Sequence, residues 1–502
     1  MQHVRDCDHM PAGLRRFGRV SDRLSGLDAS FLHLEQGGAH MHVASTLIFD
    51  GPKPEYDEFR GHVASRLHLV PRFRQKLRFV PLGLGRPAWV DDPHLNLEYH
   101  VRQTALPPPG SEEQLRVLAA RIFSQALDRS KPLWELWLVD GLEGDRFAVV
   151  GKSHHCLVDG VSGVDITTVL FDTKPEPTGP PEPPDEWLPR PQPSDAEVVA
   201  EAVLDRLTNP RELASGVVDV LRAPREIPGR VGEGLGALGA IAGTGLGAPP
   251  SPFNVEIGGH RRFAWVPGDL GQLKQIKDRL GGTVNDVVLA AVAGALGRYL
   301  RSRGHSTADL ELRAMVPISV RSEDERGALG NRVSAMMAPL PVGVEDPVRR
   351  LRIVTETMGD LKESRQAVGA TLLTELTAFA PPTLAAQAAR LQSRQRFFNL
   401  VVTNVPGPQF PLYVLGRELR AVFPMVPLAR NQAVCVGLMS YNGQINFGLV
   451  GDYDAIPDLE RLAEDLDSAI AELAAVAEAS PTLDGKPAGA GERDGSGARA
   501  QG

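Results

Sequence analysis

The feature that most constrains the fold of this chain is a proline-dense stretch at residues 173–195, TKPEPTGPPEPPDEWLPRPQPSD. Proline lacks a backbone N–H and its ring clashes with the preceding helical turn, so neither a helix nor a central strand can run through such a segment. A stretch of this composition is typical of an extended connection between folded parts. The sequence therefore predicts two folded regions, one on each side.

The region before this stretch alternates strand-like and helix-like segments, which is typical of an α/β domain. Residues 41–50, 132–142 and 146–155 are rich in β-branched and apolar residues and predict strands. Residues 111–127 begin with a Ser-x-x-Gln capping pattern and continue with apolar residues about 3.6 positions apart, which predicts a helix. A second helix is expected over 161–172.

The region after the proline stretch begins irregularly and then shows a second α/β pattern. Residues 196–207 and 214–223 predict amphipathic helices, and a Gly-rich run follows at 232–252. The second pattern predicts a helix over 283–303 and strands over 312–321, 332–342, 398–405 and 444–453. The predicted organisation is an N-terminal extension (1–20), a first α/β domain (21–174), a Pro/Gly-rich linker with amphipathic helical segments (175–253), a second α/β domain (254–476) and a disordered tail (477–502).

The composition excludes several classes of protein. With 42% hydrophobic and 23% charged residues, the chain has the make-up of a soluble globular protein. Its net charge of -8 argues against nucleic acid as a partner, since nucleic-acid binders are usually basic. The three cysteines, Cys7, Cys156 and Cys435, are far apart in sequence and indicate a reducing compartment. The chain shows neither an apolar signal segment nor a run of about 18 apolar residues, so a cytoplasmic location is expected.

The residues with the most chemistry lie in SHHCLVDG, residues 153–160, where the last predicted strand of the first region ends. Neighbouring residues of a strand point to opposite faces, so His154 and His155 are poorly placed to bind one metal ion. The chain has no HExxH pattern and no G-x-S-x-G elbow, which disfavours a metalloprotease and a serine hydrolase. Cys156 is expected to be a small buried residue, because sequence neighbours rarely form a catalytic Cys-His pair. No metal site is predicted.

The remaining catalytic interpretation is a histidine that acts as a general base. Imidazole has an unperturbed pKa near working pH, so it can take a proton from a substrate hydroxyl and return it. Asp159 could be a charge partner or could hold the loop, and Gly160 supplies an unusual backbone angle or room for a ligand. From spacing alone, two ordinary histidines in a turn remain an equally good interpretation.

The pattern H-H-x-x-x-D-G resembles the signature of the CoA-dependent acyltransferase superfamily, which includes chloramphenicol acetyltransferase and peptide-synthetase condensation domains. Further blocks narrow the resemblance: LSGLDASFLHLE (24–35), PRFRQKLRFVPLGLGRPAWVDD (71–92), LDRSKPLWELWLVDGLEG (127–144), TVNDVVLAAVAGALGRYL (283–300) and TNVPGP (403–408). From about Leu24 to about Ala475, the chain resembles the bacterial wax ester synthase/acyl-CoA:diacylglycerol acyltransferase family.

The resemblance implies an α/β fold of two chloramphenicol-acetyltransferase-like domains, with mixed sheets flanked by helices and a partly helical linker between them. It implies direct acyl transfer from acyl-CoA to the hydroxyl of a diacylglycerol or a long-chain alcohol, with acyl-CoA as a substrate and no permanently bound cofactor. By the same resemblance His155 is the base, while His154 and Asp159 are supporting residues, Asp159 being held by an arginine. Asn285 and Asp286 match an Asn-Asp pair that is important for activity in the family.

Other functions stay open at this point. A transferase of the same fold could act on another hydroxyl or on an amine, and a non-catalytic lipid-binding protein is a further alternative, although the intact HHxxxDG pattern argues against it. Since the implied substrates reside in lipid, peripheral association with a membrane or a lipid droplet is predicted through residues 196–248. A purely solvated linker is an equally good interpretation of that segment.

Overall fold

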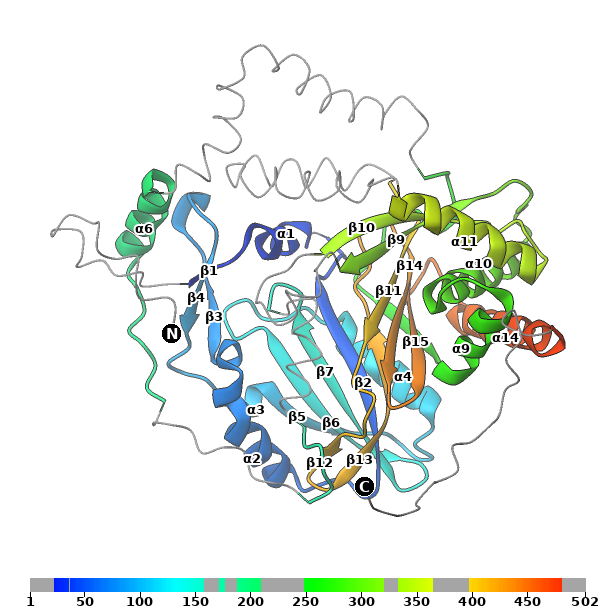
Figure 1. The fold of residues 1–502 in the computed structure, drawn as a ribbon. Coiled ribbons are helices and arrows are strands. Elements are labelled where there is room, and N and C mark those ends of the chain that lie inside the picture. Colours follow the sequence, from blue (N-terminus) through cyan, green and yellow to red (C-terminus); the bar gives the residue numbers. More distant parts are fainter. Residues whose placement is uncertain are drawn as a thin grey trace, which may run out of the picture.

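The protein was analysed as a computed structural model, which describes residues 22–35, 37–157, 171–176, 187–208, 248–319, 333–363 and 397–480. In this part of the chain, the strands form two six-stranded sheets and one three-stranded sheet. Figure 1 shows the two large sheets side by side, with α4 (Glu112–Ser124) between the two halves and most other helices on the outer sides.

The first large sheet has the strand order β12-β13-β2-β7-β6-β5. Its strands are β2 (His42–Asp50), β5 (Val101–Ala105), β6 (Trp134–Leu142), β7 (Arg146–His154), β12 (Tyr413–Val414) and β13 (Arg417–Met425). The associated helices are α1 (Gly26–Leu34), α2 (Tyr56–Arg66), α3 (Leu97–His100) and α4 (Glu112–Ser124). Ser111 and Gln114 form the predicted capping box at the start of α4.

A small sheet, with the order β1-β4-β3, lies on the outer side of the first large sheet (Figure 1). It consists of β1 (Asp22–Arg23), β3 (Gln75–Arg78) and β4 (Ala88–Asp91), with short 3-10 helices at η1 (Leu67–Leu69), η2 (Pro71–Arg74) and η3 (Pro81–Gly83). Helix α6 (Asp195–Thr208) packs here through Val198 and Ala202, which contact Val80. Part of the predicted linker, residues 195–208, is therefore a helix seated on the first half.

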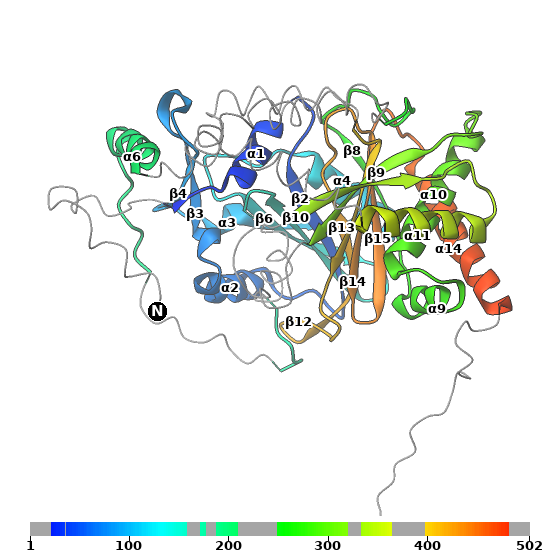
Figure 2. The ribbon, with the colours of Figure 1, turned by 45° about the horizontal axis from the view of Figure 1, so that its top comes forward.

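The second large sheet has the order β10-β9-β11-β14-β15-β8. Its strands are β8 (Arg261–Val266), β9 (Leu312–Ser319), β10 (Val333–Leu340), β11 (Leu400–Pro406), β14 (Val434–Tyr441) and β15 (Gln444–Asp452). The helices of this half are α9 (Leu270–Leu280), α10 (Val284–Ser302), α11 (Pro347–Glu363) and α14 (Leu459–Ala479). Figure 2 shows these helices together on the side away from the first sheet. Helix α10 is buried along most of its length, so it forms the centre of this half's core.

The two halves are joined by a strand exchange and by a shared apolar core. β13 comes from the C-terminal part of the chain, yet it pairs antiparallel with β2 of the first sheet, Val422 lying opposite Leu47 and Met425 opposite Ala44. Between the sheets, a single apolar cluster contains residues of both halves, including Met41 and Trp265. The histidine pair at the end of β7 therefore lies in a sheet that both halves build.

One buried arginine ties the halves together through polar contacts. Arg261, at the start of β8, donates from Nη2 to the carbonyl of Gly38 and from Nη1 to that of Gly258 at 2.7 Å, and its Nη1 lies 3.6 Å from the carboxylate of Asp452. A side chain at Gly38 would lie 2.1 Å from the oxygen of Gly258, so only glycine permits this close approach of the two backbones.

Within the residues that the structure describes, no single helix is long and apolar enough to cross a membrane. Helices α9 and α10 meet the length and composition only as a pair, across a bend of 96°.

The predicted strands and helices are confirmed wherever the structure describes them, at β2, α4, β6, β7, α6, α10, β9, β10, β11 and β15. The helices predicted over 161–172 and 214–223 lie outside the described residues, apart from the last two residues of the first. The domain boundaries stay predictions, although α14 continues to Ala479, past the predicted end of the second domain at residue 476.

Candidate functional site

His154 is the last residue of β7, and its ring has a hydrogen bond at one nitrogen and a carboxylate near the other. It lies opposite His42 of β2, and its side chain is buried. The backbone N–H of Cys156 donates to Nδ1 of His154 at 3.1 Å, so the proton of the neutral ring is on Nε2. That Nε2 lies 3.6 Å from Oε2 of Glu35. The structure thus gives His154 a defined orientation, with its N–H toward a carboxylate.

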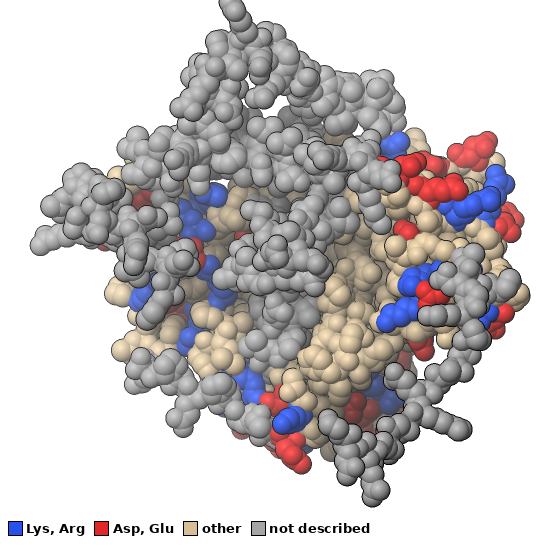
Figure 3. Space-filling view, in the orientation of Figure 1, with Lys and Arg blue, Asp and Glu red and all other residues tan. Residues whose placement is uncertain are grey.

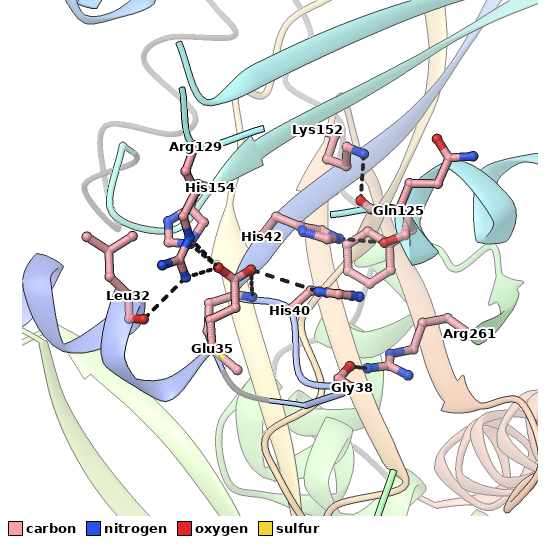
Figure 4. Close-up of polar contacts among 12 residues, drawn as sticks. Leu32, Glu35, Gly38, His40, His42, Gln125, Arg129, Lys152, His154 and Arg261 are labelled. Atoms are coloured by element: carbon pink, nitrogen blue, oxygen red, sulfur yellow. Dashed lines mark hydrogen bonds and ion pairs between the residues drawn. The ribbon is translucent and has the colours of Figure 1, made fainter. Parts of the chain in front are cut away.

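Glu35 follows directly after α1 and gathers several donors (Figure 4). Arg129 donates to Oε2 from Nε at 3.0 Å and also from Nη2, and the backbone N–H of Met41 donates to Oε1 at 3.2 Å. Burial raises the pKa of the Glu35 carboxyl, but the nearby His154 and the hydrogen bonds from Arg129 outweigh burial and hold that pKa at about 2. Glu35 is therefore a carboxylate at any pH at which the protein functions.

His155 lies in the turn after β7, and its surroundings favour the neutral imidazole. Its backbone N–H donates to the carbonyl of Met41 at 2.8 Å, and its ring stacks on Phe31 of α1 with the centroids 3.9 Å apart. Burial lowers the pKa of His155 to about 4, and a hydrogen bond with its own main chain partly opposes that shift. A ring that is neutral at pH 7 can accept a proton, as a general base must.

Cys156 fills the turn after the histidines as the sequence predicts. Its side chain is buried, and burial raises the pKa of the thiol, so it stays protonated and is unsuited to act as a nucleophile. The prediction of a small buried residue is confirmed.

A second buried polar layer lies behind the histidine pair, at the end of α4. A ring nitrogen of His42, Nε2, is hydrogen-bonded to the carbonyl of Phe123, and Nζ of Lys152 donates to the carbonyls of Ile122 and Gln125 at 3.0 and 2.9 Å. Burial lowers the pKa of His42 to about 3, so this ring too is neutral. These groups satisfy the free carbonyls of the helix end and fix α4 against β2 and β7.

Asp286 lies in the capping box of α10. The backbone N–H of Thr283 donates to Oδ2 of Asp286 at 2.8 Å, while Thr283 Oγ1 accepts from the N–H of Asp286 at 3.2 Å. Asn285 is half-buried in the same helical turn. Among the described residues, no hydrogen bond or ion pair joins Asp286 to His154 or His155, so a role of Asn285 and Asp286 in the site stays a prediction. Asp159 and Gly160 lie outside the described residues.

Three residues that surround the histidines were not predicted from the sequence as site residues: Glu35, Arg129 and Phe31. Glu35 and Phe31 belong to the block LSGLDASFLHLE, and Arg129 belongs to LDRSKPLWEL. The blocks that resemble the family therefore include these residues but do not indicate what each of them does. Their proximity arises from long-range packing: 94 positions separate Arg129 from Glu35.

Comparison with known proteins places the chain in a family. The model described as "Wax ester synthase/diacylglycerol acyltransferase catalytic domain" matches residues 24–288, and "WS/DGAT C-terminal domain" matches residues 329–474. A Mycobacterium tuberculosis protein named "Probable diacyglycerol O-acyltransferase tgs1" is 33% identical over 465 residues, which cover 91% of this chain and 96% of the relative.

Solved structures support the same grouping. The wax ester synthase/diacylglycerol acyltransferase from Marinobacter aquaeolei is 30% identical, with a TM-score of 0.63 over 91% of this chain and 100% of its own. A variant of the starter condensation domain of rhizomide synthetase RzmA, in complex with C8-CoA and Leu-SNAC, is 12% identical and has a TM-score of 0.53 over 95% of this chain and 99% of its own, so it shares the fold. The predicted two-domain α/β fold of mixed sheets flanked by helices is confirmed. This chain belongs to the wax ester synthase/diacylglycerol acyltransferase family.

Proposed function

We propose that this protein is an acyl-CoA-dependent O-acyltransferase that makes triacylglycerol from diacylglycerol, and wax esters from long-chain alcohols, with His155 as the general base. The observation that carries the proposal is a half-buried imidazole in the turn after β7, stacked on Phe31 and held by its backbone N–H, in a chain that belongs to a family of such transferases. The curated relative and the solved Marinobacter structure carry names of this activity, which supports both acceptor classes.

The reaction follows from the position of a neutral base beside two bound substrates. His155 takes the proton of the acceptor hydroxyl while the hydroxyl oxygen attacks the thioester carbonyl carbon. The C–S bond then breaks, an ester bond remains, and the imidazolium returns the proton to the CoA thiolate. No acyl-enzyme is formed, which agrees with the lack of a serine elbow and with the protonated state of Cys156.

Acyl-CoA enters this scheme as a substrate, and no resident cofactor takes part. Each bond change is accounted for by the acceptor hydroxyl, the thioester and one imidazole. Enzyme that has been dialysed against a chelator is therefore expected to keep its full turnover, and a loss that added metal restores would contradict this part of the proposal.

The experiment compares acceptors and base variants with labelled palmitoyl-CoA. Purified protein is given diacylglycerol, hexadecanol, a short alcohol or a primary amine, and thin-layer chromatography separates the products. We expect triacylglycerol and wax ester from the wild type, and a loss of about 10²- to 10⁴-fold in kcat for His155→Ala, the share that general base catalysis contributes. His94→Ala, which changes an exposed histidine of the same half, is the matched control. Near-normal turnover by His155→Ala would remove the base assignment, and a product only from the amine would redirect the acceptor class.

We further propose that the protein docks on a membrane or droplet surface through the side that carries α6 and the small sheet. Large apolar side chains are exposed there: Leu188 at 76%, Val203 at 46% and Phe79 at 45%. Helix α6, which carries Val203, adjoins the segment that carries Phe79, because Val80 contacts α6 and Gly85 lies against Ala202. In Figure 3 this side, at the left, carries basic and acidic side chains among uncharged ones, so the exposed apolar side chains are what suits it to a lipid surface.

Of the segment predicted from the sequence, 196–248, only 196–208 and residue 248 are described; Val203 lies within it, while Leu188 and Phe79 lie outside it. The double variant Leu188→Asp/Val203→Asp is expected to lose co-sedimentation with phospholipid vesicles while it keeps turnover on detergent-dispersed diacylglycerol. Val117→Asp changes an exposed apolar residue on α4 and is the control. Equal vesicle binding by all three proteins would refute the surface.

A further inference from the structure

The carboxylate of Glu35 lies at the centre of the histidine pair, and neither the family blocks nor the histidine motif assigns it a role. We propose that Glu35 is a positioning residue of the acyl transfer: through its contacts with His154 and Met41, it sets the turn in which His155 acts. This inference rests on the proposed function and deepens it.

The first argument comes from the ring of His154. Its Nδ1 accepts from the backbone N–H of Cys156, and this contact closes the turn that contains His155. Its Nε2 faces Oε2 of Glu35 at 3.6 Å, which is an electrostatic contact longer than a hydrogen bond. Without the Glu35 carboxylate the ring would lose this electrostatic contact, and it could rotate away from Cys156.

The second argument comes from the main chain of His155. Oε1 of Glu35 accepts from the N–H of Met41 at 3.2 Å, and the carbonyl of Met41 accepts from the N–H of His155 at 2.8 Å. One carboxylate is thus connected to the His154 ring through one oxygen and to the His155 backbone, by way of Met41, through the other. Both histidines take their position from a single group.

The third argument is that Glu35 itself is held firmly. Arg129 donates two hydrogen bonds to Oε2, and from Nη2 it also donates to the carbonyl of Leu32 at 3.3 Å. The second contact fixes the end of α1, the helix from which Phe31 stacks on the His155 ring. The Glu35–Arg129 ion pair therefore also orients the His155 imidazole, by way of α1 and Phe31.

The charges around this group keep its state constant. Arg129 faces Glu35 from the loop before β6, His154 from the end of β7, and His40 from the segment before β2, with its Nδ1 at 3.9 Å. His42, behind them on β2, is neutral. Glu35 therefore works as a fixed acceptor and not as an acid or base in the reaction.

The experiment removes the negative charge of the Glu35 side chain while keeping its size and shape. Glu35→Gln is compared with Glu112→Gln, which breaks an equivalent glutamate-arginine pair: Glu112 accepts from Arg146 at 2.9 Å, at the opposite end of β7. Steady-state kcat and KM for palmitoyl-CoA and diacylglycerol are measured together with the melting temperature. We expect kcat of Glu35→Gln to fall about 10- to 100-fold with KM changed less than about threefold, as for other residues that orient a reacting group.

A double-variant cycle then tests whether Glu35 acts through His154. Since His154→Asn removes the ring that Glu35 orients, Glu35→Gln/His154→Asn is expected to have a kcat close to that of His154→Asn alone. If Glu35→Gln unfolds because the charge of Arg129 has lost its carboxylate partner, the variant Glu35→Gln/Arg129→Gln, which removes both charges, takes the place of Glu35→Gln in the cycle.

The outcomes separate this inference from the proposed function. If Glu35→Gln keeps kcat within about threefold of the wild type while His155→Ala loses turnover, the role of Glu35 is refuted and the proposed function stands. Losses that multiply in the double variant, or a change confined to KM, also refute it. If the wild type itself turns over no acceptor, the proposed function fails and the role of Glu35 fails with it.

Discussion

At the scale of single residues, the chemistry depends on an imidazole that folding keeps neutral. In a solvated chain a histidine titrates near pH 6.5, but burial lowers the pKa of His155 to about 4. A base is active in its deprotonated form, so the acid limb of kcat/KM for the free enzyme is expected near pH 4 and not near 6.5. Rates from pH 5 to 8, measured in short assays with the fraction of folded protein monitored, test this.

The sign of the same shifts predicts the opposite trend for stability. His42 and His155 bind protons less readily in the folded state than in the unfolded state. Their contribution to the free energy of unfolding is therefore complete above pH 6.5, and it is lost as the pH falls toward 4 for His155 and toward 3 for His42. The free energy of unfolding should therefore fall between pH 7 and pH 5 while kcat/KM of the folded enzyme stays level. A kcat/KM that falls with an apparent pKa near 6.5 while the protein remains folded would contradict the residue-level account.

The sequence predicts part of this site and not the rest. His154 and His155 could be named because their motif is local, and strand alternation separates their side chains. Glu35, Arg129 and Phe31 could not, because a glutamate after a helix is normally a solvated group and only tertiary packing brings it to the histidines. Asp286 belongs to two patterns: Thr-x-x-Asp is typical of a helix capping box, whereas the Asn-Asp pair resembles a family motif that is important for activity.

At the scale of elements, the start of α10 allows a test of whether Asp286 acts in helix capping or in catalysis. The structure gives Asp286 two backbone partners in a capping box, so Asp286→Ala is expected to cost about 1 kcal/mol or more of stability. Activity should fall only as far as folded protein is lost and should recover at lower temperature. Circular-dichroism melts and kcat at two temperatures measure this.

The neighbouring helix supplies the matched control for this test. Asp269 caps α9 by accepting from the N–H of Gln272 at 3.1 Å, and it is not part of the Asn-Asp pair. Asp269→Ala should behave in the same way. A large loss of kcat in fully folded Asp286→Ala, without a matching loss in Asp269→Ala, would instead assign Asp286 to the reaction.

Elements were predictable where the local pattern is strong. The strands around the histidines and the long apolar helix α10 follow from periodicity, and their bounds agree with the structure to within a few residues. The pairing of those strands does not follow from periodicity. Nothing in residues 413–425 indicates that β12 and β13 join the first sheet, because a strand's sequence records which of its faces is buried but not its neighbour.

At the scale of the whole molecule, this exchange makes the halves interdependent. Residues 1–253 alone would lack β13, so β2 would become an exposed edge and Leu47 would lose its cover from Val422. We expect that fragment to aggregate when expressed alone and to become soluble when it is co-expressed with residues 254–502. Soluble yield and co-purification of the two fragments measure this. A soluble, monodisperse fragment 1–253 would show that the first half is complete without β13.

The same strand order has a consequence for how the protein is made. Between the end of β2 at Asp50 and the start of β13 at Arg417 the ribosome must add the intervening chain, which takes roughly 20–70 s at bacterial elongation rates. In the later part of that time the half that carries the histidine pair has been synthesised, with one edge of its main sheet unpaired. Its survival in the cell therefore depends on how quickly the last part of the message is translated, and on which chaperones shield that edge until it is.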